Sequence, residues 1–226
     1  CIIFLKTNNE TKFQQLVEDG QKFVNQNSNS AIAWNLLALG HRYNGNTTAA
    51  LKIYEDLLQL NPGNFLLSTN LGNLYMAMGK VSKAIECFEI AYEKDPKHVN
   101  NLEALAIAYQ DTGSKDKAIE TFKKVLEIDQ TKESARYHLA RIFVNLESYE
   151  EAIEHFDKTN FGLSKSHLLE CLYYLGEKDK FYKYYKVFFP RIPKLLGQYF
   201  LLIWLGSNQI LYLGTFHIYN QDGKGK

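Results

Sequence analysis

Hydrophobic and small residues recur along this chain with a fixed step of 34 positions. Four columns keep their character through four successive copies: leucines Leu37, Leu71, Leu105 and Leu139; small residues Ala38, Gly72, Ala106 and Ala140; alanines Ala50, Ala84, Ala118 and Ala152; and aromatic residues Tyr54, Phe88, Phe122 and Phe156. In each copy the apolar residues fall at helical spacing on both sides of a turn, which predicts two amphipathic helices per copy. A fixed period of this length indicates an array of stacked repeats rather than one or two ordinary globular domains.

Residue size along the columns predicts how these helices pack. Small side chains let paired helices approach to about 8–10 Å, and the leucine and aromatic columns fill the space between them. A glycine column suits the left-handed backbone conformation that ends a first helix. Its members are Gly45, Gly79 and Gly113, with Glu147 as the exception in the fourth copy. We therefore expect four units, at 31–64, 65–98, 99–132 and 133–163.

Shorter or weaker copies are expected at both ends of the array. The N-terminal segment 1–30 contains a capping helix, which we interpret as the lone second helix of an incomplete unit. A degenerate fifth unit is expected over 164–190, where Gly176 aligns with the glycine column and bulky Phe181 stands in place of alanine. The bulk of Phe181 should make the helices of this unit cross differently. The alignment also requires the fourth unit to be some five residues shorter than the others.

The C-terminal segment 191–226 has a different character. From Leu195 to Gln221 it contains no charged residue, and the apolar stretch Leu195–Tyr219 is long enough to cross a bilayer. Polar residues interrupt that stretch, and the same letters also fit two short β-like runs around a turn. Three interpretations stay open: a lid on the stack or the start of another domain, a translation or assembly artefact of a fragment, or a membrane helix.

Charge and cysteine content narrow the class of protein. The formal net charge is +1 over 226 residues, with acids and bases mixed, so no electrostatic argument favours a nucleic acid or an anionic membrane as partner. The three cysteines lie far apart and are best interpreted as reduced thiols, which favours a cytoplasmic location, with membrane association left open. The chain does not begin with methionine, and we interpret it as a fragment or a processed start.

Recognisable catalytic patterns are missing from the sequence. It has no glycine-rich phosphate loop, no Cys/His zinc spacing and no nucleophile elbow. His155-Phe156-Asp157 resembles an iron-binding pair, but two side chains two residues apart on a helix do not converge on one ion. Tyrosines and lysines interleave over 173–186, where helical spacing makes the tyrosines core and the lysines a solvated face. We therefore expect no catalysis, no cofactor and no metal.

The columns resemble the tetratricopeptide repeat (TPR), whose pattern is W-x₂-L-G-x₂-Y, then A-x₃-F, then P. The matching residues are Trp34, Leu37, Ala38, His41, Ala50, Tyr54 and Pro62 in the first unit, and Leu71, Gly72, Tyr75, Ala84, Phe88 and Pro96 in the second. The third and fourth units keep the pattern but lose the proline. The resemblance covers 31–163, extends weakly over 164–190, and implies an all-α, right-handed α-solenoid of antiparallel helix pairs, a TPR superhelix.

The resemblance also implies that side chains of the first helices line a concave surface that binds other proteins. The corresponding residues are Asn35, Leu39, Arg42, Thr69, Asn70, Asn73, Met76, Glu103, Ile107, Gln110, Tyr137, Arg141 and Asn145. Amides in this set can pair with the backbone of an extended peptide, and the apolar members can receive its side chains. Two narrower modes of the family, a carboxylate clamp and an asparagine ladder, are unsupported, since only Asn70 matches either pattern.

These observations predict a protein–protein interaction scaffold that binds a partner peptide or protein, and no nucleic acid, on its concave surface. The alternative is the recognition arm of a larger enzyme, glycosyl- or sulfotransferase-like, whose catalytic domain is not in this chain.

Overall fold

The computed structural model describes the backbone of residues 2–188 and the side chains of residues 11–188. Residues 2–188 form helices joined by short loops, without a strand among them. The helices are α1 (Ile2–Gln26), α2 (Ala31–Tyr43), α3 (Thr47–Leu60), α4 (Phe65–Ala77), α5 (Val81–Lys94), α6 (Val99–Asp111), α7 (Lys115–Ile128), α8 (Glu133–Asn145), α9 (Tyr149–Asp157), α10 (Ser164–Tyr174) and α11 (Lys178–Phe188). The predicted all-α solenoid of antiparallel helix pairs is confirmed.

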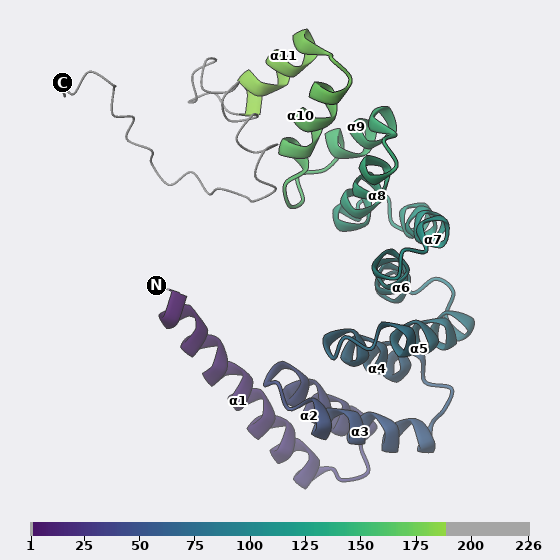
Figure 1. Cartoon of the computed structure of the whole chain (residues 1–226). Coiled ribbons are helices and arrows are strands. Elements are labelled where there is room, and N and C mark those ends of the chain that lie inside the picture. The colour runs from purple at the N-terminus through teal and green to yellow at the C-terminus, as the bar shows by residue number, and fades with distance from the viewer. Residues whose placement is uncertain (1, 189–226) are drawn as a thin grey trace, which may run out of the picture. The chain divides into compact units, whose positions relative to one another are not determined.

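The chain divides into two compact units between Ser164 and Lys165. In the first unit, each helix from α1 to α9 packs against the next, and α2, α4, α6 and α8 also contact one another in that order. Figure 1 shows these four first helices on the inner side of a curve, with the second helices α3, α5, α7 and α9 on its outer side. The first helices therefore form a continuous inner layer.

Local sequence signals set where the helices begin and turn. Asn46 and Asn64 each accept a hydrogen bond from the backbone N–H three residues later, which caps the N-termini of α3 and α4. The three-residue loops inside each pair contain one residue with a positive φ. These residues are Gly45 (80°), Gly79 (71°), Gly113 (76°) and Glu147 (58°). Glu147 therefore adopts the conformation that glycine adopts in the other copies.

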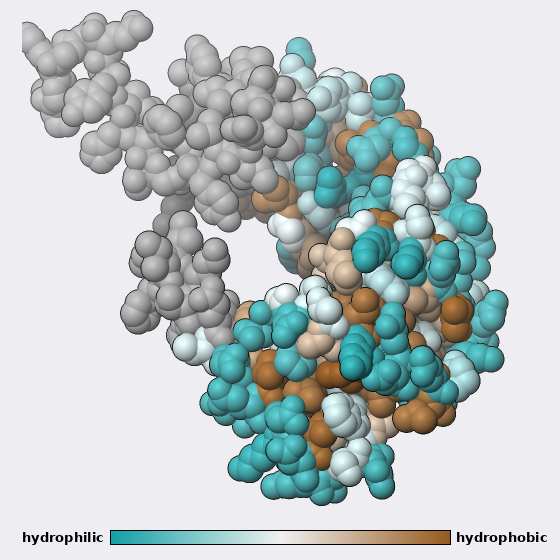
Figure 2. Space-filling model, turned by 60° about the horizontal axis from the view of Figure 1, so that its bottom comes forward, coloured by the Kyte–Doolittle hydropathy of each residue, from teal (hydrophilic) through white to brown (hydrophobic). Residues whose placement is uncertain are grey.

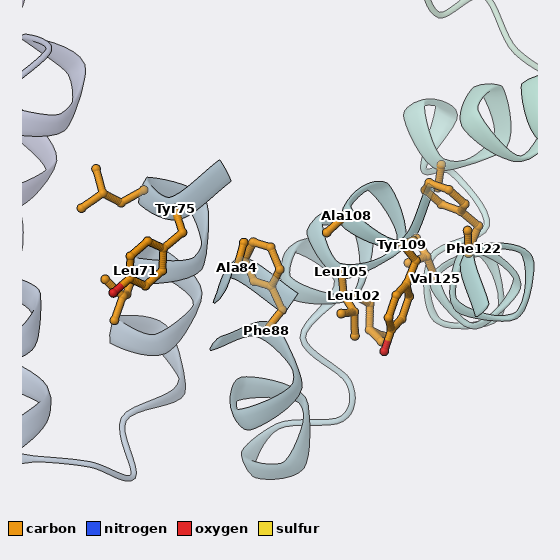
Figure 3. Packing of buried hydrophobic residues seen from close by; sticks show 14 of the residues in the cluster. Leu71, Tyr75, Ala84, Phe88, Leu102, Leu105, Ala108, Tyr109, Phe122 and Val125 are labelled. Atoms are coloured by element: carbon orange, nitrogen blue, oxygen red, sulfur yellow. The ribbon is translucent and has the colours of Figure 1, made fainter. Parts of the chain in front are cut away.

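The repeated columns form the core of the first unit. All four columns are buried, and the alanine and aromatic columns are fully enclosed. Figure 3 shows Ala84 and Phe88 of α5 close to Leu102 and Leu105 of α6. The closest approach is at Gly72, where a Cβ atom would lie 2.5 Å from the ring of Phe88. At this position the absence of a side chain is therefore required by the contact with Phe88.

Helix α1 packs on α2 through two glycines. A Cβ atom on Gly20 would lie 2.8 Å from the Cα atom of Leu37, and one on Gly40 would lie 3.0 Å from the backbone nitrogen of Val17. The loop 27–30 before α2 has four residues, the same length as the loops before α4, α6 and α8. Helix α1 thus occupies the position of a second helix relative to α2.

The fourth repeat is shortened in its second helix. Helix α9 has 9 residues, whereas α3, α5 and α7 each have 14. The loop 158–163 that follows is longer than the other loops between units, and α10 has 11 residues, so the position of Gly176 depends on all three elements. Gly176 has a positive φ of 71° in the turn after α10, like the glycines in the turns after α2, α4 and α6.

The second unit is described over α10 and α11. Phe181 and Tyr185 of α11 are buried and their rings stack with centroids 6.1 Å apart. The altered helix crossing expected from Phe181 stays a prediction. The apolar segment Leu195–Tyr219 lies outside the described residues. Among residues 2–188, no helix combines the length and apolar character needed to cross a bilayer.

Candidate functional site

The candidate site is a stripe of side chains on the first helices, here called the inner row. On α2 it consists of Asn35, Leu39 and Arg42, which share one helix face at spacings of four and three residues. The 34-residue step gives the equivalent residues Thr69, Asn73 and Met76 on α4, Glu103, Ile107 and Gln110 on α6, and Tyr137, Arg141 and Val144 on α8. Val144 therefore belongs to the row, and the predicted Asn145 is its neighbour at the end of α8.

Burial separates the predicted residues into three groups. Thr69 and Tyr137 are buried, with 5% and 9% of their surface exposed. Arg141 and Asn145 are exposed. The remaining predicted residues are half-buried: Asn35, Leu39, Arg42, Asn70, Asn73, Met76, Glu103, Ile107 and Gln110. Thr69 and Tyr137 therefore serve packing, and the other residues can touch a ligand.

Several polar residues of the row connect consecutive first helices. The Nδ2 atom of Asn70 donates a hydrogen bond of 2.9 Å to the Oδ1 atom of Asn35 on the preceding first helix. The Oγ1 atom of Thr69 donates one of 3.0 Å to Oδ1 of Asn101 on the following one. Buried Asn101 in turn donates to the carbonyl oxygen of Phe88. These bonds fix the spacing of α2, α4 and α6.

The carboxylate of Glu103 is engaged by residues of the loop before α8 and of α8 itself. The Nζ atom of Lys132 lies 2.9 Å from Oε2 of Glu103, and the pair is largely withdrawn from solvent. The hydroxyl of Ser134 donates to the other carboxylate oxygen. Because both oxygens are engaged, Glu103 contributes a link between α6 and α8 rather than a free negative charge.

The two arginines of the row lie against aromatic rings. The guanidinium of Arg42 lies 4.6 Å from the ring centroid of Tyr43, and that of Arg141 lies 6.0 Å from the ring centroid of Tyr137. Stacking on a ring limits the rotamers of an arginine while its N–H groups remain available. No acidic side chain of residues 11–188 forms an ion pair with Arg42.

Two half-buried histidines, on α8 and α9, have lowered pKa values. The rings of His138 and Phe122 stack with centroids 5.7 Å apart, and the Nδ1 atom of His138 is buried without a hydrogen-bond partner among the described residues. Burial lowers the pKa of His138, and the charge of Arg141 lowers it further. His155 stacks on Phe143 in the same way, and burial again lowers its pKa. Both rings therefore act as packed aromatic groups.

Other features offer no rival site among the described residues. No group of three or more metal-ligating side chains comes together within them. Large exposed apolar side chains occur elsewhere, including Ile32 and Leu60. On the face drawn in Figure 2, hydrophobic residues form separate patches between hydrophilic ones. Scattered apolar residues are normal on a protein surface.

The sequence interpretation missed Asn101 and Lys132, which carry the links between repeats. A signal for Asn101 was present: the 34-residue step places it in the buried column Ala33, Leu67, Asn101 and Ala135. A polar residue in an apolar buried column requires hydrogen-bond partners. Lys132 had no comparable signal because it lies in a loop between helices.

Comparisons with known families match the repeats. A family model described as "Tetratricopeptide repeat" matches residues 42–106, and one described as "Anaphase-promoting complex, cyclosome, subunit 3" matches residues 77–159. A search of curated proteins found no match.

Solved structures share the fold at low sequence identity. The chain is similar to MamA (22% identity, TM-score 0.64, covering 69% of this chain and 88% of MamA) and to PilF of Pseudomonas aeruginosa (18%, 0.70, covering 88% and 93%). YrrB, described as "a TPR protein with an unusual peptide-binding site", gives 16% identity and a TM-score of 0.63, covering 77% of this chain and 94% of YrrB. The family models and the buried columns support the predicted tetratricopeptide-type repeats in this chain, and the solved structures share their fold.

Proposed function

We propose that this chain is a non-catalytic scaffold that binds a partner peptide or protein on the inner row. The observation that carries the proposal is the combination of half-buried apolar and amide side chains along consecutive first helices, represented by Leu39, Asn73 and Ile107. YrrB is described as having a peptide-binding site, and the shared fold makes the same kind of ligand reasonable here.

The chemistry of the row suits an extended main chain. An amide such as that of Asn73 offers both a donor and an acceptor, so it can pair with a peptide group whatever the adjacent side chain. Met76 and Ile107 provide apolar surface, and covering their remaining exposed area with a ligand side chain is favourable. A recognition arm of a larger enzyme would use the same surface, so one binding test serves both possibilities.

A matched pair of variants tests the location of the site. Peptides that bind the wild-type chain are first selected from a displayed random library. Ile107→Glu places a charge in the inner row, and Ile90→Glu makes the same change at an exposed position of the second helix α5. We expect Ile107→Glu to weaken binding at least tenfold and Ile90→Glu to leave it unchanged, with equal helicity by circular dichroism. Loss of binding only in Ile90→Glu would place the site elsewhere.

A further inference from the structure

We propose that the ligand of the inner row is an extended peptide with an acidic group at its α2 end, followed by about six uncharged residues that lie across α4 and α6. This inference rests on the proposed function and specifies the chemistry of its ligand. It follows from the distribution of charge along the row.

The α2 end of the row presents a preoriented cation. Arg42 is half-buried, its guanidinium lies 4.6 Å from the ring centroid of Tyr43, and no carboxylate among residues 11–188 forms an ion pair with it. A guanidinium held in one orientation binds a carboxylate through two parallel hydrogen bonds at small entropic cost. A carboxylate is therefore the group that this end of the row fits best.

The middle of the row is uncharged. Helix α4 contains no acidic or basic residue, and its row members Asn73 and Met76 are neutral. On α6 the row continues with Ile107 and Gln110, and the carboxylate of Glu103 is neutralised by Lys132. A ligand charge placed over this surface would lose hydration without gaining a counter-charge, so the ligand residues here must be neutral.

The α8 end of the row favours neither a positive nor a negative group of the ligand. Arg141 is exposed on α8, and Asp111 is exposed at the last position of α6. These two residues belong to α6 and α8, which are consecutive first helices in contact. Opposite charges close together cancel much of each other's field at a ligand. The charge preference of the row is therefore confined to its α2 end.

The length of the neutral part follows from helix spacing. Because α2 contacts α4 and α4 contacts α6, two steps of about 8–10 Å separate α2 from α6. An extended chain covers about 3.3 Å per residue, so about five or six residues span this distance. An octapeptide contains the acidic group and the neutral part.

The test selects octapeptides from a fully random displayed library on the purified chain. We expect Asp or Glu to be enriched at one end and charged residues to be depleted at the six positions that follow. Peptides that differ only in Glu, Gln or Lys at the end position are then compared by fluorescence anisotropy. The Glu peptide should bind at least tenfold more tightly than the Gln peptide, and the Lys peptide should bind most weakly.

Three variants assign this preference to one residue. Arg42→Glu should reverse the order so that the Lys peptide binds best, and Arg42→Gln should abolish the preference. Lys52→Glu, at an exposed position of the second helix α3, is the matched control and should keep the wild-type order. The acidic group can be a side chain or the free C-terminal carboxylate of the peptide. Comparing each peptide with its C-terminally amidated form distinguishes these two sources of the charge.

Each outcome has a distinct meaning. Equal binding of the Glu, Gln and Lys peptides, or an unchanged order in Arg42→Glu, overturns the proposed ligand chemistry while the inner row remains a peptide site. If every selected peptide binds the Ile107→Glu variant as tightly as the wild type, the proposed function is overturned together with this inference.

Discussion

The hydroxyl group of Tyr54 provides a direct test of the packing at the aromatic column. Tyr54 is fully buried, as are Phe88, Phe122 and Phe156 at the equivalent positions of the other repeats. Its hydroxyl oxygen has no hydrogen-bond partner among the described residues. Burial raises the pKa of Tyr54 well above its usual value, so the group stays neutral, but its hydration is lost without replacement. We therefore expect Tyr54→Phe to stabilise the chain.

The magnitude follows from the cost of an unpaired buried group. Leaving a buried donor or acceptor without a partner costs about 1–3 kcal/mol. Tyr54→Phe removes that cost and keeps the ring, so the loss of packing is small. A net gain of about 1–2 kcal/mol is expected, which corresponds to a rise in the melting temperature of roughly 2–8 °C for a chain of this size.

Thermal and urea unfolding followed by circular dichroism at 222 nm measure the effect. The reverse substitution, Phe88→Tyr, is the matched control: it places a hydroxyl in an equally buried position and should lower stability by about 1–3 kcal/mol. A melting temperature of Tyr54→Phe equal to or below that of the wild type would show that the hydroxyl is hydrogen-bonded in solution, and the packing argument at this column would fail.

Three further predictions concern close contacts and half-buried histidines. Gly72→Ala places a Cβ atom 2.5 Å from the fully buried ring of Phe88. Overpacking costs about 1–3 kcal/mol and alanine returns about 1 kcal/mol of helix propensity, so urea unfolding should show a free energy of unfolding lower by roughly 1 kcal/mol. A higher free energy of unfolding would contradict the close contact. Burial lowers the pKa values of His138 and His155 below 6.5 in the folded chain. Below about pH 6.5 the unfolded chain therefore binds more protons at these sites than the folded chain, so the urea midpoint should fall as the pH drops. Replacing both histidines by phenylalanine should remove this pH dependence. Gly20→Ala sets a Cβ atom 2.8 Å from the backbone of α2 and should speed proteolysis of the loop 27–30, whereas Gly63→Ala, which meets nothing within 4 Å, should leave it unchanged.

The helices and their order could be predicted because every repeat buries the same columns. A helix that packs on both neighbours must repeat its small and large residues with the period of the array, so one sequence step carries the fold. The same logic reached the fifth copy: α10 begins 31 residues after α8, whereas α4, α6 and α8 each begin 34 residues after the preceding first helix. Gly176 nevertheless has the positive φ of the glycine column. The period is therefore informative even where it is broken.

The polar contacts between repeats could not be predicted in the same way. Asn70 reaches Asn35, and Lys132 reaches Glu103, over separations of 35 and 29 residues. These separations differ from the period because they depend on side-chain length and loop geometry as well as on the repeat. Thr69 was predicted to bind a ligand because of its position in the repeat. Its hydroxyl instead donates a hydrogen bond to Asn101, which occupies a different position of the repeat.

Periodicity also leaves open which exposed face of a repeat array binds a ligand. The most exposed large apolar residues, Leu60 and Ile32, lie near loops between repeats, where neighbouring helices do not shield them. Ile107 and Met76 are less exposed because consecutive first helices flank them. A ligand bound between such flanking helices touches several side chains at once, and helices that are already fixed by hydrogen bonds lose little freedom when it binds. Partial burial, rather than exposed hydrophobicity, is thus the property that favours the inner row.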